Sequence, residues 1–414
     1  MKRPLCLLLL ILSVSIPAGA EEITFLYMKQ SGYDLPDIVD RAQSFQKLTG
    51  IRVNPVFVEY KDRYSLIEES ARKIIPDYDL VLLDLIWTAD FAEHGIIDPL
   101  PGPLVQKVKT GIVPKIYEAF AYHDLLWGVP FHADFQLLYT NLDLLYKAGF
   151  TSPPRTLEEM VRTAREVKKR GIIEYPLFDS WNEQEVLVCE FTWIVGAFGG
   201  SLTDAEGRID LTSAPCLSAL AFMRSLLAEG LMNPYSLQSE ENFVSEVFQS
   251  GDCLFTTNWS FLIRLLGGNQ KQAPMRWALS PIPVSEAIAR TGVTTSSVCG
   301  FEGLAVTSRS RHKESAWRFA LYLDSPEFQG RHLEFMPVWK EVWSMPSTLR
   351  DDPYLPIKQL QIAGLQYRPV HPRYGEISAL LQGWIFKALK GTVSPELALR
   401  EAQKGIDALA GTAQ

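Results

Sequence analysis

The residues best suited to chemistry are acidic and aromatic side chains placed directly after apolar segments. Asp84 ends the apolar run 79–84, and Trp87 follows three residues later. A carboxylate in that place can accept hydrogen bonds from two hydroxyls, and an indole ring can cover the apolar face of a pyranose. Alternatively, Asp84 caps the following helix and Trp87 packs in a core. The local pattern fits either role.

Known catalytic and metal-binding motifs are absent from the sequence. There is no G-x-S-x-G elbow, phosphate-binding P-loop, G-x-G-x-x-G fingerprint or H-E-x-x-H pair. The six histidines are scattered without the spacing of metal ligands. We therefore expect no catalytic residue, no cofactor and no metal. Carboxylate pairs abound in an acidic chain, so a secreted carbohydrate-active hydrolase with two acids in a cleft stays an alternative.

The elements that must position these side chains alternate between strand and helix. Strands are predicted at 23–27, 51–58 and 79–84, with helices beginning near 34 and 63. Asp34 has the character of an N-cap, and Gly50 ends the first helix. This alternation is typical of an α/β fold, and right-handed crossovers would make the sheet parallel. In an open sheet of this kind, ligands bind beyond the carboxyl ends of the strands.

The pattern continues to the C-terminus without a linker rich in proline, glycine or serine. A strand is expected at about 129–139, and Thr156 with Glu159 forms a capping box that opens a helix to about 170. Further helices are expected at 183–197, 214–229, 240–249, 316–323, 354–363, 377–390 and 395–409, and further strands at 253–257, 276–282 and 303–307. Two domains would therefore be connected by more than one crossing of the chain.

The first twenty residues have the pattern of a secretory signal peptide. Lys2 and Arg3 precede the apolar stretch 5–16, and Ala18-Gly19-Ala20 forms a cleavage site, so cleavage is predicted after Ala20. The apolar stretch is shorter than the roughly 20 residues that a membrane-spanning helix needs. Because no cysteine stands at the cleavage point, we expect free release rather than a lipid anchor.

Charge and length restrict the class of protein further. The 414 residues include 40 basic and 48 acidic side chains, a net charge of −8, and the loss of Lys2 and Arg3 would make it −10. A nucleic-acid partner is excluded, because it would require a concentrated basic face. The length is sufficient for two sizeable cores.

Four cysteines remain after cleavage: Cys189, Cys216, Cys253 and Cys299. In an oxidising compartment they allow three complete pairings, and the sequence does not select one. Buried thiols and a single disulfide both stay open. A zinc ribbon or redox pair is not expected, since no C-x-x-C is present.

Six segments, in order along the chain, resemble those of one family. They are 24–26 with 45–53, 78–100, 127–145, 253–259, 299–306 and 368–378. The second contains Asp84 and Trp87, the fourth ends in Asn258-Trp259, and the fifth is similar to a "G-G-W-x-L-x-V" loop, with Phe301 in place of tryptophan. In these segments the chain resembles a family 1 extracellular solute-binding protein, a carbohydrate receptor of ABC importers of the trehalose and maltose type.

The resemblance implies a type II periplasmic binding protein fold, with two α/β lobes and a hinge that the chain crosses three times. The implied lobes are 21–131 with 279–325, and 132–278 with 326–414. The implied function is that of a monomeric periplasmic receptor. It would capture a disaccharide or short oligosaccharide between its lobes and deliver it to an ABC permease and its ATPase.

The resemblance also implies a set of ligand-binding residues: Asp84, Trp87, Asp134, Trp181, Trp259, Gly300, Phe301 and Arg373. The aspartates and Arg373 would hold hydroxyls through charge-assisted hydrogen bonds. Trp259 and Phe301 would stack on sugar faces, and Gly300 would bring a backbone N–H close to the ligand. Core packing for Trp181 and a salt bridge at a helix end for Arg373 are the structural alternatives.

Other ligands fit the same fold. A polyol would need a similar set of acceptors, whereas a glycerol phosphodiester would need more basic or helix-terminal contacts, for which Arg373 is the lone obvious candidate. Ferric iron is disfavoured because adjacent tyrosines are absent. The sequence does not identify the sugar.

Overall fold

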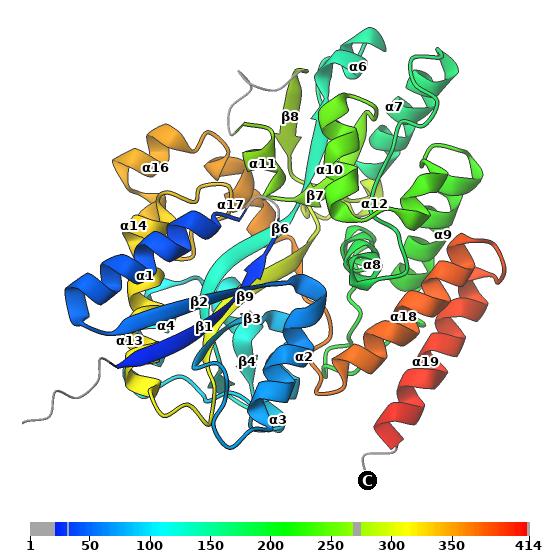
Figure 1. The fold of residues 1–414 in the computed structure, drawn as a ribbon. Helices are drawn as coiled ribbons and strands as arrows, with labels where there is room; N and C mark the ends of the chain where they lie inside the picture. The colour runs from blue at the N-terminus through cyan, green and yellow to red at the C-terminus, as the bar shows by residue number, and fades with distance from the viewer. Residues whose placement is uncertain (1–20, 31–32, 268–274, 412–414) are drawn as a thin grey trace, which may run out of the picture.

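The computed structural model describes residues 21–30, 33–267 and 275–411. The predicted signal peptide, 1–20, and its cleavage site lie outside these ranges. The described chain forms two α/β lobes that lie side by side (Figure 1). None of the helices in these ranges is long and apolar enough to cross a membrane.

The first lobe begins with three parallel strands in the order β2-β1-β3: β1 (Glu22–Lys29), β2 (Arg52–Glu59) and β3 (Leu80–Asp84). Helix α1 (Leu35–Thr49) connects β1 to β2. The Asp34 carboxylate accepts the N–H of Asp37 at 3.1 Å, and Gly50 closes the helix with a φ of 79°. The predicted N-cap at Asp34 and the predicted helix end at Gly50 are both confirmed.

The sheet is mixed rather than wholly parallel. Strand β9 (Ser297–Val306) lies antiparallel to β3, and β6 (Val129–Asn141) lies antiparallel to β9. The expected parallel arrangement therefore holds for β1 to β3 only. The reason is topological: β9 returns from the second lobe as an extended strand and does not follow a helical crossover within the first lobe.

Strand β6 connects the two lobes. Residues 129–135 pair with β9, whereas residues 136–141 pair with β7 (Phe255–Trp259) and β8 (Trp277–Ser280). Strand β9 runs back in the opposite direction. A third connection follows β10 (Leu365–Gln366) and leads to α18 (Tyr374–Leu389). These are the three crossings of the type II fold, and that expectation is confirmed.

The remaining elements cover the sheets. In the first half of the chain they are α2 (Tyr60–Ala71), η1 (Leu85–Trp87), α3 (Thr88–Glu93), α4 (Gly102–Gly111), α5 (Pro114–Tyr117), η2 (Glu118–Phe120), β4 (Ala121–Tyr122), β5 (Leu125–Leu126), α6 (Leu142–Lys147), α7 (Leu157–Lys169) and α8 (Glu185–Ala197). In the second half they are α9 (Ala214–Ala228), η3 (Pro234–Gln238), α10 (Glu241–Ser250), α11 (Leu262–Leu265), α12 (Glu286–Ala289), α13 (Lys313–Leu323), α14 (Pro326–Gln329), α15 (Lys340–Trp343), α16 (Pro346–Asp351), α17 (Leu355–Ala363) and α19 (Pro395–Gly411).

Two apolar cores stabilise the molecule. The first contains the inner residues of β1, β3 and β9 with α1 and α13, and the second lies among α7, α8, α9, α18 and α19. Phe328, Met336 and Leu355 pack in the first core. This core also contains Phe248, Leu262 and Trp277 of the second lobe, so it extends across both lobes, and the lobe boundaries stay a prediction.

The four cysteines are buried. The structure has free thiols at all four positions: Cys189, Cys216, Cys253 and Cys299. Of the two alternatives left open by the sequence, it therefore shows buried thiols and not a disulfide. Burial raises the pKa of each thiol, which keeps the sulfurs protonated and unreactive.

Candidate ligand-binding cleft

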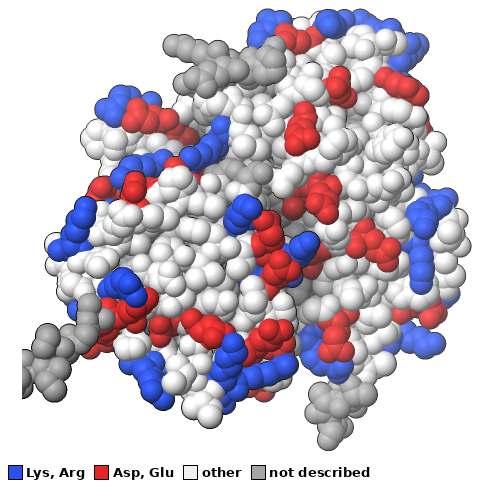
Figure 2. Space-filling model, viewed as in Figure 1, with Lys and Arg blue, Asp and Glu red and all other residues white. Residues whose placement is uncertain are grey.

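A cleft of about 770 Å³ opens between the two lobes. Its walls come from the ends of β1 and β3, the start of α2, the middle of β9, the start of α8 and α10, and the end of β7. The lining residues are Met28, Lys29, Gln30, Tyr33, Leu35, Glu59, Tyr60, Lys61, Asp84, Asp134, Gln184, Glu185, Val186, Cys189, Glu240, Glu241, Asn242, Trp259, Gly300, Glu302 and Arg368. Figure 2 shows acidic side chains gathered along the hollow at the centre of the molecule.

The sheet register brings the key residues of four neighbouring strands together. The cross-strand pairs are Asp84 with Glu302, Asp134 with Gly300, and Gln136 with Trp259. Four of the eight residues predicted from the sequence line the cleft: Asp84, Asp134, Trp259 and Gly300. They come from β3, β6, β7 and β9, so only the sheet makes them neighbours.

Phe301 does not line the cleft, for a reason that follows from strand geometry. Side chains alternate between the two faces of a strand, so Gly300 and Glu302 share the face that looks into the cleft. Phe301 points to the other face, is fully buried and packs in the first core. Glu302 takes the place in the cleft wall that the resemblance assigned to Phe301.

Asp84 combines the two roles that its sequence position allowed. One oxygen, Oδ1, accepts the Ile86 N–H at 3.3 Å and caps η1. The other oxygen, Oδ2, accepts the hydroxyl of Tyr60 at 3.0 Å and lies 3.7 Å from the guanidinium of Arg63. The residue is 6% exposed, and its side chain reaches the cleft. Burial beside a cation keeps this carboxylate fixed in the cleft wall.

A fully buried arginine supports the floor of the cleft. Arg63 Nη1 donates to Glu302 Oε1 at 2.5 Å, and the hydroxyl of Tyr33 donates to Glu302 Oε2 at 2.9 Å. Trp87 covers this guanidinium, with the ring centroid 4.6 Å from the Arg63 carbon Cζ. Trp87 thus lies behind the cleft wall and supports Arg63 through a cation–π contact.

A second arginine joins the lobes and was not predicted. Arg368 Nη1 donates to Glu185 Oε1 at 2.7 Å, and Nη2 donates to the carbonyl of Cys299 at 3.1 Å and lies 3.9 Å from Asp84 Oδ1. The segment 368–378 was among those that resemble the family, but Arg373 was the residue predicted from it to bind ligand. Arg368 directly follows the extended segment after β10, which places it at the third crossing of the chain.

Arg373 lies instead at the start of α18. Its Nε donates to Glu376 Oε1 at 2.6 Å and its Nη1 donates to the carbonyl of Leu409 at 2.9 Å. This is the salt bridge at a helix terminus that the sequence analysis gave as its structural alternative. The helix-terminal position directs the guanidinium to α19 and away from the cleft.

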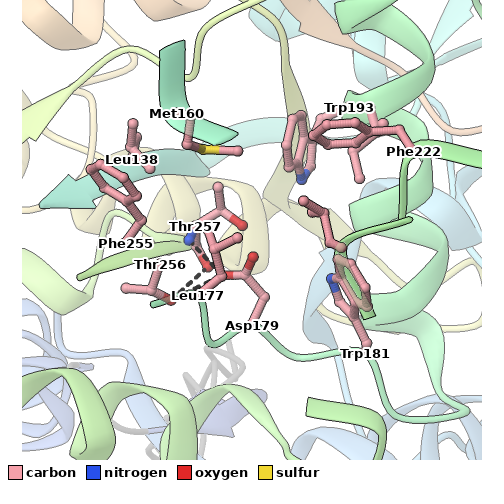
Figure 3. A pocket seen from close by; sticks show the side chains of 12 residues that line it. Leu138, Met160, Leu177, Asp179, Trp181, Trp193, Phe222, Phe255, Thr256 and Thr257 are labelled. Atoms are coloured by element: carbon pink, nitrogen blue, oxygen red, sulfur yellow. Dashed lines mark hydrogen bonds between the residues drawn. The ribbon is translucent and has the colours of Figure 1, made fainter. Parts of the chain in front are cut away.

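Trp181 belongs to a separate internal cavity of about 10 Å³, enough for roughly one water. Figure 3 shows Trp181 near Trp193 and Phe222, with Asp179 and Thr257 on another wall. The Asp179 carboxylate accepts the Thr257 N–H at 2.7 Å. Trp181 is 1% exposed and packs in the second core, as its structural alternative had it.

Asp134 and Trp259 line the cleft on the side of the second lobe. The Oδ1 atom of Asp134 accepts the N–H and the hydroxyl of Ser260 at 2.8 and 2.7 Å, and the Phe135 N–H at 2.8 Å. Burial nevertheless raises the pKa of Asp134 to about 7. Trp259 Nε1 donates to Glu241 Oε1 at 2.6 Å. The indole face is thereby held in a fixed orientation at the cleft.

The cleft is rich in hydrogen-bond acceptors and carries excess negative charge. Its lining includes seven acidic residues and three basic ones. Such a surface suits a ligand with many hydroxyl donors and repels a phosphodiester or a uronic acid. Within the described residues, no group of three or more His, Cys, Asp or Glu side chains is arranged to hold a metal ion.

The comparison with known families agrees with this geometry. Residues 27–330 match the family described as bacterial extracellular solute-binding protein. The chain belongs to this family. Members of the family bind solutes outside the cytoplasm, so the expectations of a binding protein and of an extracytoplasmic location are confirmed at that level.

Individual relatives are distant but match along most of the chain. A "Probable ABC transporter-binding protein" of Deinococcus radiodurans is 23% identical, over 97% of this chain and 97% of that protein. The structure is similar to maltose-bound MalE3 of T. maritima, with a TM-score of 0.83, 23% identity, and 94% and 100% of the two chains covered. It is also similar to a solute-binding protein of Thermotoga lettingae bound with α-D-tagatose, with a TM-score of 0.82, 23% identity, and coverage of 93% and 98%.

Proposed function

We propose that this protein is the sugar receptor of an ABC importer. It binds a disaccharide or short oligosaccharide between its lobes and delivers it to the membrane permease and its ATPase. The observation that carries the proposal is the cleft itself, in which Trp259 presents an indole face beside the carboxylates of Asp84 and Asp134. An aromatic platform flanked by fixed acceptors complements the apolar face and the hydroxyl rim of a pyranose.

The cleft supports capture by closure of the two lobes. Asp84 and Glu302 come from the first-lobe sheet, whereas Glu185 and Trp259 come from elements of the second lobe. A ligand that contacts both sets favours the closed state, because those contacts exist together only when the lobes approach. The permease can then distinguish the loaded receptor from the empty one. We place the receptor in the periplasm as a monomer, released after cleavage at Ala20.

The alternatives have less support from the cleft. A glycerol phosphodiester would meet excess negative charge, and Arg373, the contact suggested for it, lies at the α18–α19 contact. The carboxylates of Glu302 and Glu185 are already engaged by arginines, which disfavours these two acids as a hydrolytic pair. A polyol would use the same acceptors and differs only in lacking a ring to stack on Trp259.

Calorimetry with a panel of glycans and polyols tests the proposal. We expect saturable binding of at least one disaccharide or oligosaccharide, with a dissociation constant in the micromolar range, about −8 kcal/mol. Trp259→Ala should abolish binding, whereas Trp181→Phe, which alters a tryptophan in the second core, should preserve it. Product analysis after prolonged incubation should show no cleavage. Sugar release that Asp84→Asn or Asp134→Asn abolishes would identify a hydrolase instead.

A further inference from the structure

The charges lining the cleft are unevenly compensated. Arg63 is bonded to Glu302, Arg368 is bonded to Glu185, and both guanidinium groups lie within 4 Å of Asp84. At the cleft entrance, Lys29 pairs with Glu59 at 3.2 Å. The carboxylates on the first-lobe side and at the lobe junction therefore have cationic partners within the protein.

Among the described residues, the carboxylates around Trp259 have no such cationic partner. Asp134 is 4% exposed, and its three hydrogen bonds all reach Oδ1. Its second oxygen, Oδ2, accepts no hydrogen bond from the described residues although the side chain lines the cleft. Glu241 accepts the neutral N–H of Trp259. Neither carboxylate forms an ion pair within the part of the chain that the structure describes, and Glu240 adds a third acid to this wall.

The backbone gives these groups a common geometry. Asp134 lies directly across the β6–β9 ladder from Gly300, and the ring of Trp259 lies over Gly300. The indole face, Asp134 and Glu241 are therefore parts of one wall. A π face with adjacent carboxylates is the arrangement that attracts a cation, since both the ring quadrupole and the anions contribute in a partly desolvated site.

We propose that the ligand is a sugar with a protonated amine, and that the ammonium group binds at the wall formed by Asp134, Glu241 and Trp259. This inference rests on the proposed function and specifies its substrate class. An unpaired buried carboxylate costs free energy, and a ligand cation with N–H donors offsets that cost in a way that a neutral hydroxyl cannot. The raised pKa of Asp134 is consistent with a carboxylate that lacks its cation in the empty cleft.

Matched pairs of ligands test the inference on the wild-type protein. The first pair is the β-1,4-linked glucosamine disaccharide and cellobiose, and the second is 2-amino-2-deoxytrehalose and trehalose, in which a primary amine stands against a hydroxyl. Calorimetry at pH 7.5 should show at least one amine binding ten-fold or more tightly than its neutral partner. Equal or tighter binding of the neutral partners overturns the inference and leaves the proposed function intact. Failure of all four sugars while a neutral glycan of the wider panel binds overturns the inference alone. Failure of the whole panel overturns both, and so does binding of spermidine alone.

A charge-neutralising variant locates the amine. Asp134→Asn keeps an oxygen for Ser260 and Phe135 but removes the anion, so it should reduce amine affinity at least ten-fold and change the affinity of the neutral partner less than three-fold. The matched control is Asp179→Asn, a buried aspartate of the second lobe that lies outside the cleft and whose pKa is also raised to about 7. It should leave both affinities unchanged. Equal losses for amine and neutral sugar in Asp134→Asn, with circular dichroism showing a folded protein, overturn the assignment.

Discussion

The indole ring of Trp259 lies against the backbone of Gly300. A Cβ atom at position 300 would stand 2.4 Å from the ring atom Cζ3 and 2.8 Å from Cη2, closer than non-bonded carbons approach. Trp259 ends β7 and Gly300 lies in β9, two strands that both pair with β6 and do not pair with each other. Glycine at 300 therefore sets the position of the aromatic face in the cleft.

We expect Gly300→Ala to displace this ring without unfolding the protein. The methyl group would push Trp259 from its hydrogen bond with Glu241, so ligand affinity should fall ten-fold or more while the melting temperature changes little. Tryptophan fluorescence and calorimetry would measure both effects. Gly375→Ala, at a helical glycine with open space around it, is the control. Unchanged affinity in Gly300→Ala would show that the ring position is not critical.

Arg368 should be essential for the connection between the lobes. Arg368→Met leaves Glu185 and Asp84 without this cation, and breaking a buried pair from one side costs about 3 kcal/mol or more. Denaturant unfolding should show that loss together with weaker ligand binding. Arg350→Met, which removes a fully exposed surface pair with Asp351, should cause no measurable loss of stability. A similar cost for both variants would contradict the role of Arg368.

Phe301 should affect stability and not affinity. Because its ring lies on the core face of β9, Phe301→Leu should lower the free energy of unfolding by about 1–2 kcal/mol through imperfect refilling of the core. The dissociation constant should stay within two-fold of the wild type. A large loss of affinity at wild-type stability would restore Phe301 as a ligand contact.

Arg373, which the resemblance implied as a ligand-binding residue, should not affect ligand binding. Its bonds go to Glu376 and Leu409, so Arg373→Gln should leave ligand affinity unchanged and lower stability only slightly. Calorimetry on the same ligand panel is the measurement. A ten-fold loss of affinity would place this guanidinium at the ligand after all.

The pH dependence of stability should depend in part on Asp179. Burial raises its pKa to about 7 in the folded protein, against about 3.9 in an unfolded chain. Between these values the folded state holds a proton that the unfolded state releases, so stability falls as the pH rises through this window. Asp179→Asn has no carboxyl group to titrate, so its stability does not show this loss. The melting temperature of the variant minus that of the wild type should therefore increase by about 2–4 °C between pH 5 and pH 8. Glu206→Gln, at the surface, should show no such change, and a flat difference for Asp179→Asn would contradict the prediction.

Local signals predicted local structure well. Asp34 and Gly50 bound α1, and the Thr156 hydroxyl caps α7, because these caps depend on side chains within a few residues. The Glu159 carboxylate accepts the N–H of Arg155 rather than that of Thr156, so the capping box is only half formed. The continuous apolar run 80–83 is a strand buried on both faces, as its composition predicted. The antiparallel position of β9 could not be derived in this way, since it depends on a chain that returns from the other lobe.

The sequence by itself determined the elements, their order, the acidic and aromatic character of the site, and the resemblance to a family. Only the tertiary structure decided which of those residues meet. Alternation along β9 turns Glu302 to the cleft and Phe301 to the core, and the third crossing places Arg368, not Arg373, beside Asp84. Residue type and short-range spacing are encoded locally, whereas the facing of a strand and the convergence of three crossings depend on contacts between residues hundreds of positions apart.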